Sequence, residues 1–126
     1  MGFKDYIDDL RSFDFNGRMN RAKYWMYILY GFLLSWVIEF MLSMIVGIIG
    51  SEEVLLLSIV LSFVLYIVFA ILTLPFTVRR LHDLNKSGWW YLIFLIPIIN
   101  FFFGLYVGFF KGTDGTNQYG PDPLAK

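Results

Sequence analysis

The sequence contains no cysteine and a single histidine, and only 16% of its 126 residues are charged. Without thiols, disulfides and thiolate metal sites are excluded. Lysine plus arginine and aspartate plus glutamate each number 10, so the net charge is zero and the position of the charges along the chain matters more than their sum. We expect no metal, no other cofactor and no nucleic-acid partner.

Apolar residues are abundant: 58% of the chain is hydrophobic and 21% is aromatic, which is too apolar for an ordinary soluble domain of this length. Three runs almost free of charge cover residues 24–49, 54–78 and 89–110. Each is long enough for a helix to cross roughly 30 Å of hydrocarbon. The sequence therefore predicts an all-α membrane protein, a single integral domain over residues 1–126 with a bundle of three transmembrane helices.

The basic residues are distributed unevenly between the two sides that these runs would separate. Five precede the first run, none lies in the link at residues 50–53, three follow the second run and two lie in the tail at residues 111–126. The positive-inside rule then places the N-terminus and residues 79–88 in the cytoplasm. Three complete crossings would place the tail outside.

The N-terminal segment, residues 1–14, has apolar residues at helical spacing: Phe3, Tyr6, Ile7, Leu10 and Phe13. This spacing predicts a short amphipathic helix at the membrane surface. Its polar face is mostly acidic and is not attracted to anionic lipid, so apolar burial or the protein's own basic groups must hold it. The alternative is a frayed terminus.

Small and polar residues recur every fourth position in the apolar runs, as in helices that pack closely in membranes. They predict helix packing, and with it a possible route to self-association, through Gly31, Ser35, Ser43, Gly47, Ser58, Ser62, Gly104 and Gly108.

Two stronger polar residues, Glu39 and Asn100, also lie within the runs. Glu39 is either a cation or proton site in a pathway, or a protonated acid satisfied by Ser35, Ser43 or a hydroxyl on another helix. Asn100 follows Pro97, and the two could break the third run into a re-entrant hairpin that returns the tail to the cytoplasm. A complete crossing is the main prediction for this run.

Polar motifs flank the runs. Arg18, Arg21 and Trp25, at i, i+3 and i+7, open the first run. A basic segment that ends in Trp89 and Trp90 leads into the third run. Basic residues followed by tryptophans suit the phosphate headgroups and the boundary between headgroups and acyl chains. Arg79 could pair with Asp83 if the second helix continues that far. Within the tail, residues 111–126, the turn-rich stretch of residues 112–123 is expected to form an ordered cap over the bundle end. The predicted headgroup or partner contacts are Arg18, Arg21, Trp25, Arg79, Arg80, His82, Asp83, Lys86, Trp89 and Trp90.

Three polar pieces together resemble the bacterial inner-membrane family called domain of unknown function 805, over about residues 15–123. They are residues 15–25 (FNGRMNRAKYW), residues 79–90 (RRLHD through SGWW), and Gly112-Thr113 with Gly115, Asn117 and Tyr119 to Pro123. The resemblance implies a small multi-pass protein of a bacterial cytoplasmic membrane. It implies no reaction, cofactor or catalytic residue.

The main functional prediction is a non-enzymatic interaction or regulatory membrane protein, whose basic cytoplasmic face contacts anionic phospholipid or an unknown protein partner. One alternative is an oligomeric channel or transporter subunit with Glu39 and Asn100 along a path. The other is an enzyme acting on lipid headgroups through His82 and Asp83. These two residues are adjacent and point in different directions on a helix, and no nucleophile or second carboxylate accompanies them.

Overall fold

The structure is a computed structural model and describes residues 2–125. In this range the chain forms α1 (Phe3–Ser12), α2 (Arg21–Ile49), α3 (Glu52–Asp83), the 3-10 helix η1 (Gly88–Leu95) and α4 (Ile99–Phe109). Over the same residues the β-structure is limited to one isolated bridge between Asn117 and Gly120. The prediction of an all-helical membrane fold is confirmed.

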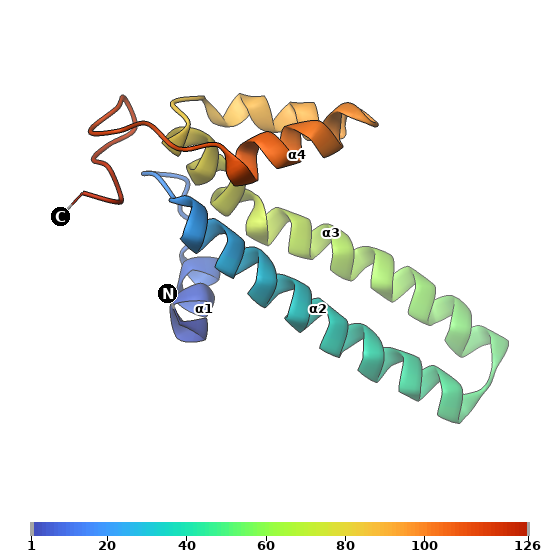
Figure 1. The fold of residues 1–126 in the computed structure, drawn as a ribbon. Helices are drawn as coiled ribbons and strands as arrows, with labels where there is room; N and C mark the ends of the chain where they lie inside the picture. The colour runs from blue at the N-terminus through green and yellow to red at the C-terminus, as the bar shows by residue number, and fades with distance from the viewer. Residues whose placement is uncertain (1, 126) are drawn as a thin grey trace.

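Helices α2 and α3 form a long antiparallel hairpin, which extends away from the end where α1 and the tail gather (Figure 1). Both helices are long and apolar enough to cross a membrane. Local sequence sets their ends: the Asn20 side chain caps α2, Gly50 ends it at φ 66°, and the Ser51 hydroxyl caps α3. α3 continues through the basic segment to Asp83, so residues 79–83 lie on a helix rather than in a loop.

The third apolar run does not cross the membrane as one helix. η1 ends at Leu95, Ile98 adopts a positive φ of 70°, and α4 begins at Ile99. The chain then runs back beside η1, with the rings of Phe94 and Phe103 5.0 Å apart (Figure 1). Pro97 has no N–H to donate and restricts the residue before it, which favours the break at this point.

The predicted complete crossing is therefore wrong, and the re-entrant alternative is the one observed. α4 has 11 residues and is about 16 Å long, roughly half of the hydrocarbon thickness. The tail consequently lies at the same end of the molecule as Gly17 and His82, not at the opposite end. The arrangement of three complete crossings, which would have put the tail at the end opposite to the N-terminus, therefore does not occur.

α1 docks against the bundle, as predicted. Tyr6 is fully buried, and its ring centroid lies 5.3 Å from that of Tyr27 and 5.9 Å from that of Phe76. On the polar face of α1, Asp9 lies 3.3 Å from Lys23 Nζ and accepts a hydrogen bond from the Tyr27 hydroxyl. Burial and the protein's own basic groups thus hold this helix, and the frayed terminus is excluded.

The small-residue rows are used only in part for packing inside the chain. A Cβ at Gly31 would lie 2.5 Å from the Phe69 ring of α3, and Gly104 faces Phe94. At Gly47, by contrast, an added Cβ would meet nothing within 4 Å. The hydroxyls of Ser43 and Ser58 bond to carbonyls of their own helices, at Glu39 and Leu55. Internal helix packing is therefore tightest near the end where α1 docks.

Candidate functional site

The centre of the polar end is the carboxylate of Asp83, which lies between two arginines. Its Oδ1 accepts from Arg18 Nε at 2.9 Å, and its Oδ2 accepts from Arg80 Nη1 at 2.6 Å. The exposed fractions of the three side chains are 1%, 0% and 5% for Arg18, Arg80 and Asp83. We call these three residues the arginine joint. A buried charge is stable only when it is paired and hydrogen-bonded, and Asp83 supplies one negative charge for two positive ones.

Arg80 uses its remaining donors to cap the C-terminal end of α4. Its Nε donates to the carbonyl of Val107 at 2.8 Å, and its Nη2 donates to that of Phe110. The last carbonyls of a helix lack partners within the helix, and a cation there also interacts favourably with the helix dipole. Arg80 thus fastens the re-entrant hairpin to α3.

Two side chains of α2 complete this cap. Trp25 Nε1 donates to the Gly108 carbonyl at 2.7 Å, and Arg21 Nη1 donates to the Phe109 carbonyl at 3.0 Å. A Cβ at Gly108 would lie 2.4 Å from the Trp25 ring, so the close approach requires glycine. The i, i+4 spacing of Arg21 and Trp25 therefore serves to hold α4 against α2.

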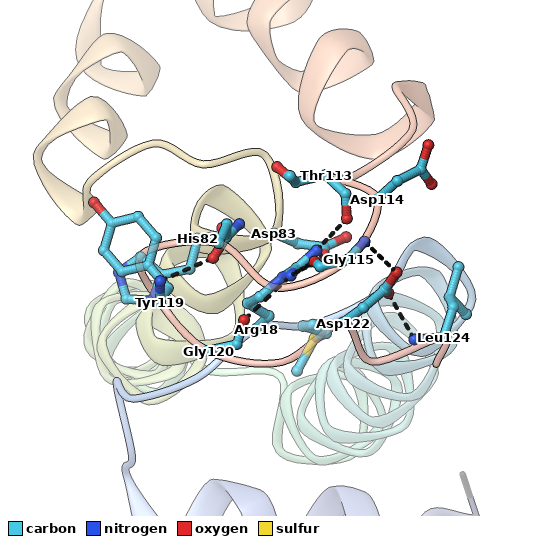
Figure 2. Close-up of polar contacts among 12 residues, drawn as sticks. Arg18, His82, Asp83, Thr113, Asp114, Gly115, Tyr119, Gly120, Asp122 and Leu124 are labelled. Carbon is cyan, nitrogen blue, oxygen red and sulfur yellow. Dashed lines mark hydrogen bonds and ion pairs between the residues drawn. The ribbon is translucent and has the colours of Figure 1, made fainter. Parts of the chain in front are cut away.

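Arg18 fastens the tail. Its guanidinium donates to the carbonyls of Gly115 at 2.6 Å and Gly120 at 3.3 Å, and also to that of Thr113 (Figure 2). The Thr113 amide in turn donates to the Asp83 carbonyl at 2.7 Å. A Cβ at the preceding residue, Gly112, would lie 2.0 Å from Asp83 Oδ2, so only glycine fits there. The tail carbonyls thus solvate the second arginine charge of the joint.

His82 holds the tail from the other side. Its ring stacks on that of Tyr119 with centroids 4.0 Å apart and planes 5° from parallel (Figure 2). Nδ1 lies 2.9 Å from the Gly17 carbonyl, which can only accept, so Nδ1 carries the hydrogen. The His82 carbonyl accepts from the Asn117 side chain at 2.9 Å. His82 and Asp83 therefore face different partners and do not form a catalytic dyad.

Asp122 stabilises the turns of the tail. Hydrogen bonds from the backbone amides of Leu124 and Gly115 hold the pKa of its carboxyl below the usual 3.8 (Figure 2). The prediction that the tail forms an ordered cap over the bundle end is confirmed by these bonds and by those to Arg18.

These contacts correct several predicted roles. Arg18, Arg79, Arg80 and Asp83 are buried against the protein itself, so their side chains do not contact lipid headgroups. The predicted pair between Arg79 and Asp83 is also wrong. Arg80 makes the pair at i, i+3, because its side chain, and not that of Arg79, points into the joint. Arg79 instead lies over the Phe76 ring, 3.8 Å from Asp9.

The other predicted contacts stay near the surface at this end. Lys86 Nζ lies 4.5 Å from the ring centroid of Trp90 and 5.9 Å from that of Tyr106. Trp89 is 80% exposed, and Trp25 keeps part of its indole exposed beside Arg21. We call the exposed residues Arg21, Trp25, Trp89 and Trp90, together with the half-buried Lys86, the exposed basic-aromatic surface.

Sequence reasoning missed the main acceptors of the two arginines. They are backbone carbonyls, which every residue carries, so residue identity gives no signal for them. The acceptors are those of Met19, Val107, Phe110, Thr113, Gly115 and Gly120. The one available signal was the turn-rich composition of residues 112–123, which predicted an ordered cap without naming its contacts.

The intramembrane polar residues lie apart from the joint. Glu39 Oε2 accepts from the Ser62 hydroxyl on α3 at 2.9 Å, so a hydroxyl on another helix does reach this acid. Both residues line a groove between α2 and α3 that Asn100 does not line. In the part of the chain that the structure describes, no three His, Cys, Asp or Glu residues are grouped to hold a metal ion.

Comparisons with known proteins agree with this architecture. The family described as "Protein of unknown function (DUF805)" matches residues 12–121. The inner membrane protein YhaH of Escherichia coli K12 is 34% identical over 119 residues, 94% of each chain. The inner membrane protein YhaI of the same strain is 34% identical over 122 residues, 94% of this chain and 93% of its own. No solved structure matches. The chain therefore belongs to the DUF805 family.

Proposed function

We propose that this membrane protein is a non-enzymatic interaction protein, whose exposed basic-aromatic surface contacts the headgroups of anionic phospholipids on the cytoplasmic side. The observation that carries the proposal is the position of Lys86. Its ammonium lies beside Trp90 and makes no ion pair with a carboxylate of residues 2–125. A cation beside exposed indoles at the end of membrane-spanning helices suits the phosphate and acyl boundary.

The arginine joint supports a structural rather than a catalytic role for the polar motifs. Both oxygens of Asp83 accept from arginines, and His82 is engaged by Gly17 and Tyr119. A general base needs a lone pair that can reach a substrate proton, and the Asp83 carboxylate is buried among its partners. The joint is better suited to holding the exposed surface in one shape.

The cytoplasmic orientation has support from the charge pattern together with the fold. None of the ten lysines and arginines lies between residues 24 and 78. With α2 and α3 as the two crossings, every basic residue then belongs to the same side, and the link at residues 50–53 carries none. This is a stronger positive-inside bias than a three-crossing arrangement would give.

Native mass spectrometry of the full chain from nanodiscs with phosphatidylglycerol and phosphatidylethanolamine tests the proposal. Lys86→Gln should lower the retained phosphatidylglycerol about fivefold, since a basic residue near an anionic surface contributes about 1 kcal/mol. The Lys86 side chain makes no hydrogen bond in the described structure, and the bond from its backbone amide to the Leu81 carbonyl is kept in the variant, so the fold should persist. Lys4→Gln on the exposed face of α1 is the matched control, and its lipid content should stay at the parent level.

Equal phosphatidylglycerol in the Lys86→Gln protein and the parent would refute the lipid contact. Trp89→Ala provides an independent check, because the highly exposed indole has no other packing role in the described chain. It should weaken lipid retention without lowering the unfolding temperature.

A further inference from the structure

The groove between α2 and α3 combines apolar walls with a single carboxylate. It has a volume of about 510 Å³, within the range of small-molecule sites. Tyr27, Phe32, Tyr66 and Phe69 contribute aromatic rings to its walls, and Glu39 lines its end nearest the link between the helices. Glu39 is exposed, so the groove gives a ligand direct access to its carboxylate.

Among residues 2–125 the Glu39 carboxylate has no counter-charge of its own. Ser62 donates one hydrogen bond to it, and a hydroxyl does not neutralise a charge. All the lysines and arginines lie outside residues 24–78, the part of the sequence that holds most of α2 and α3. An ionised acid in hydrocarbon is costly unless it is paired, so a cation that pairs with Glu39 must come from outside the chain.

The aromatic walls of the groove also favour a positively charged ligand. The face of an aromatic ring is electrostatically negative and attracts cations, which is how proteins recognise quaternary ammonium ions. A groove lined by phenyl and phenol rings, with one carboxylate at its end, therefore selects a ligand that is positively charged and also apolar enough to displace lipid from the groove.

The depth of Glu39 excludes ordinary headgroup amines. It lies about 27 Å along α2 from Arg21 and about 16 Å from Gly50, inside the hydrocarbon from either side. An amine fixed at the membrane surface does not reach it. We propose that this groove binds lipophilic organic cations, ammonium or phosphonium ions with apolar substituents, with Glu39 as the counter-ion.

Binding of tetraphenylphosphonium to the full-length protein in nanodiscs tests this site. Equilibrium dialysis should show saturable binding that Glu39→Gln weakens at least tenfold, because glutamine keeps the shape and the hydrogen bond but removes the charge. Glu52→Gln, at the exposed start of α3, is the matched control and should bind as the parent does. Tetraphenylborate, an anion of the same shape, should not compete.

A second measurement uses the unmodified protein, so it does not depend on the folding of a variant. Dicyclohexylcarbodiimide enters hydrocarbon and adds to a carboxyl group there, and peptide mass spectrometry reads the labelled residue. Tetraphenylphosphonium should slow labelling of Glu39, and tetraphenylborate should not. Equal affinity in the Glu39→Gln protein, or labelling that the phosphonium does not slow, overturns the proposal and indicates that lipid chains alone fill the groove.

Discussion

The two ends of the molecule are held together in different ways. At the polar end, segments more than 60 residues apart meet through directional bonds, such as those from Arg18 to Asp83 and to Gly115. In the far half of the α2–α3 hairpin, the bond between Glu39 and Ser62 joins the helices, while neighbouring serines bond to their own helix. The chain itself therefore fixes the shape of the polar end more firmly than that of the far half.

The tail and the link lie at opposite ends of the molecule (Figure 1), and this gives an all-or-none prediction for membrane topology. Because the chain lacks cysteine, Thr116→Cys in the tail and Glu53→Cys in the link each introduce a single thiol, both at exposed positions. In intact spheroplasts, a membrane-impermeant maleimide should label the link variant only. The tail variant should react after permeabilisation. Reaction of the tail thiol in intact spheroplasts would mean that the third run crosses completely.

Loss of the central carboxylate should cause the largest change in stability. Asp83→Asn leaves the buried charges of Arg18 and Arg80 without a counter-charge, at a cost of about 3–5 kcal/mol. Thermal unfolding in mild detergent, followed by tryptophan fluorescence, measures the loss. Asp114→Asn is the control, because its ion pair with Lys111 is exposed and contributes at most about 1 kcal/mol. Similar losses in the two variants would contradict the role of the joint.

Two glycines sharpen the comparison between the ends. Gly108→Ala places a Cβ 2.4 Å from the Trp25 ring, so the indole must move and its bond to the Gly108 carbonyl breaks. We expect a loss of about 1–3 kcal/mol and a shifted tryptophan emission. In Gly47→Ala the added Cβ meets nothing within 4 Å. This variant should keep the tryptophan emission of the parent, and its stability should be unchanged or slightly higher. A larger loss at Gly47 would indicate that a partner helix covers it.

The smallest predicted effect concerns pH. The folded-state pKa of Asp122 lies below its unfolded value of 3.8, so the stability contributed by its carboxylate is complete above that value and is lost as the pH falls through the folded pKa. Hydrogen exchange at the Gly115 and Leu124 amides should therefore show protection at pH 5 that weakens toward pH 3. In the Asp122→Asn protein this pH dependence should disappear, and its persistence would assign it to another group.

Periodicity and run length predicted the elements that depend on local sequence. The apolar spacing of residues 3–13 identified α1, and two uncharged runs identified α2 and α3. The third run was harder, because its 22 residues satisfy the length of a crossing as well as that of two short helices. Pro97 and Asn100 indicated where a break could occur, but the choice depends on whether bonds elsewhere hold the returning chain, here those to Val107, Gly108 and Phe109.

The arginine joint shows a pairing that sequence spacing alone does not determine. Arg79 and Arg80 are both within helical reach of Asp83, and sequence spacing favoured Arg79 at i, i+4. The structure pairs Arg80 at i, i+3, because that face of α3 meets α4 and the tail, while Arg79 meets α1. Which face meets which neighbour is a property of the whole fold, and the tail residues that decide it lie about 30 positions away.

The order in which the ribosome synthesises the residues of the arginine joint and their tail contacts has a consequence for folding. Arg18 leaves the ribosome first, Asp83 follows, and Thr113, Gly115 and Gly120 come last, although Asp83 and these three tail residues all contact the Arg18 guanidinium. The α2–α3 hairpin therefore inserts while Arg18 and Arg80 still lack most of their acceptors. Translation must pass residue 120 before the joint can close. A nascent chain that stops at α4 would lack the three tail carbonyls that Arg18 contacts, so the Arg18 guanidinium would stay open to water and the joint incomplete.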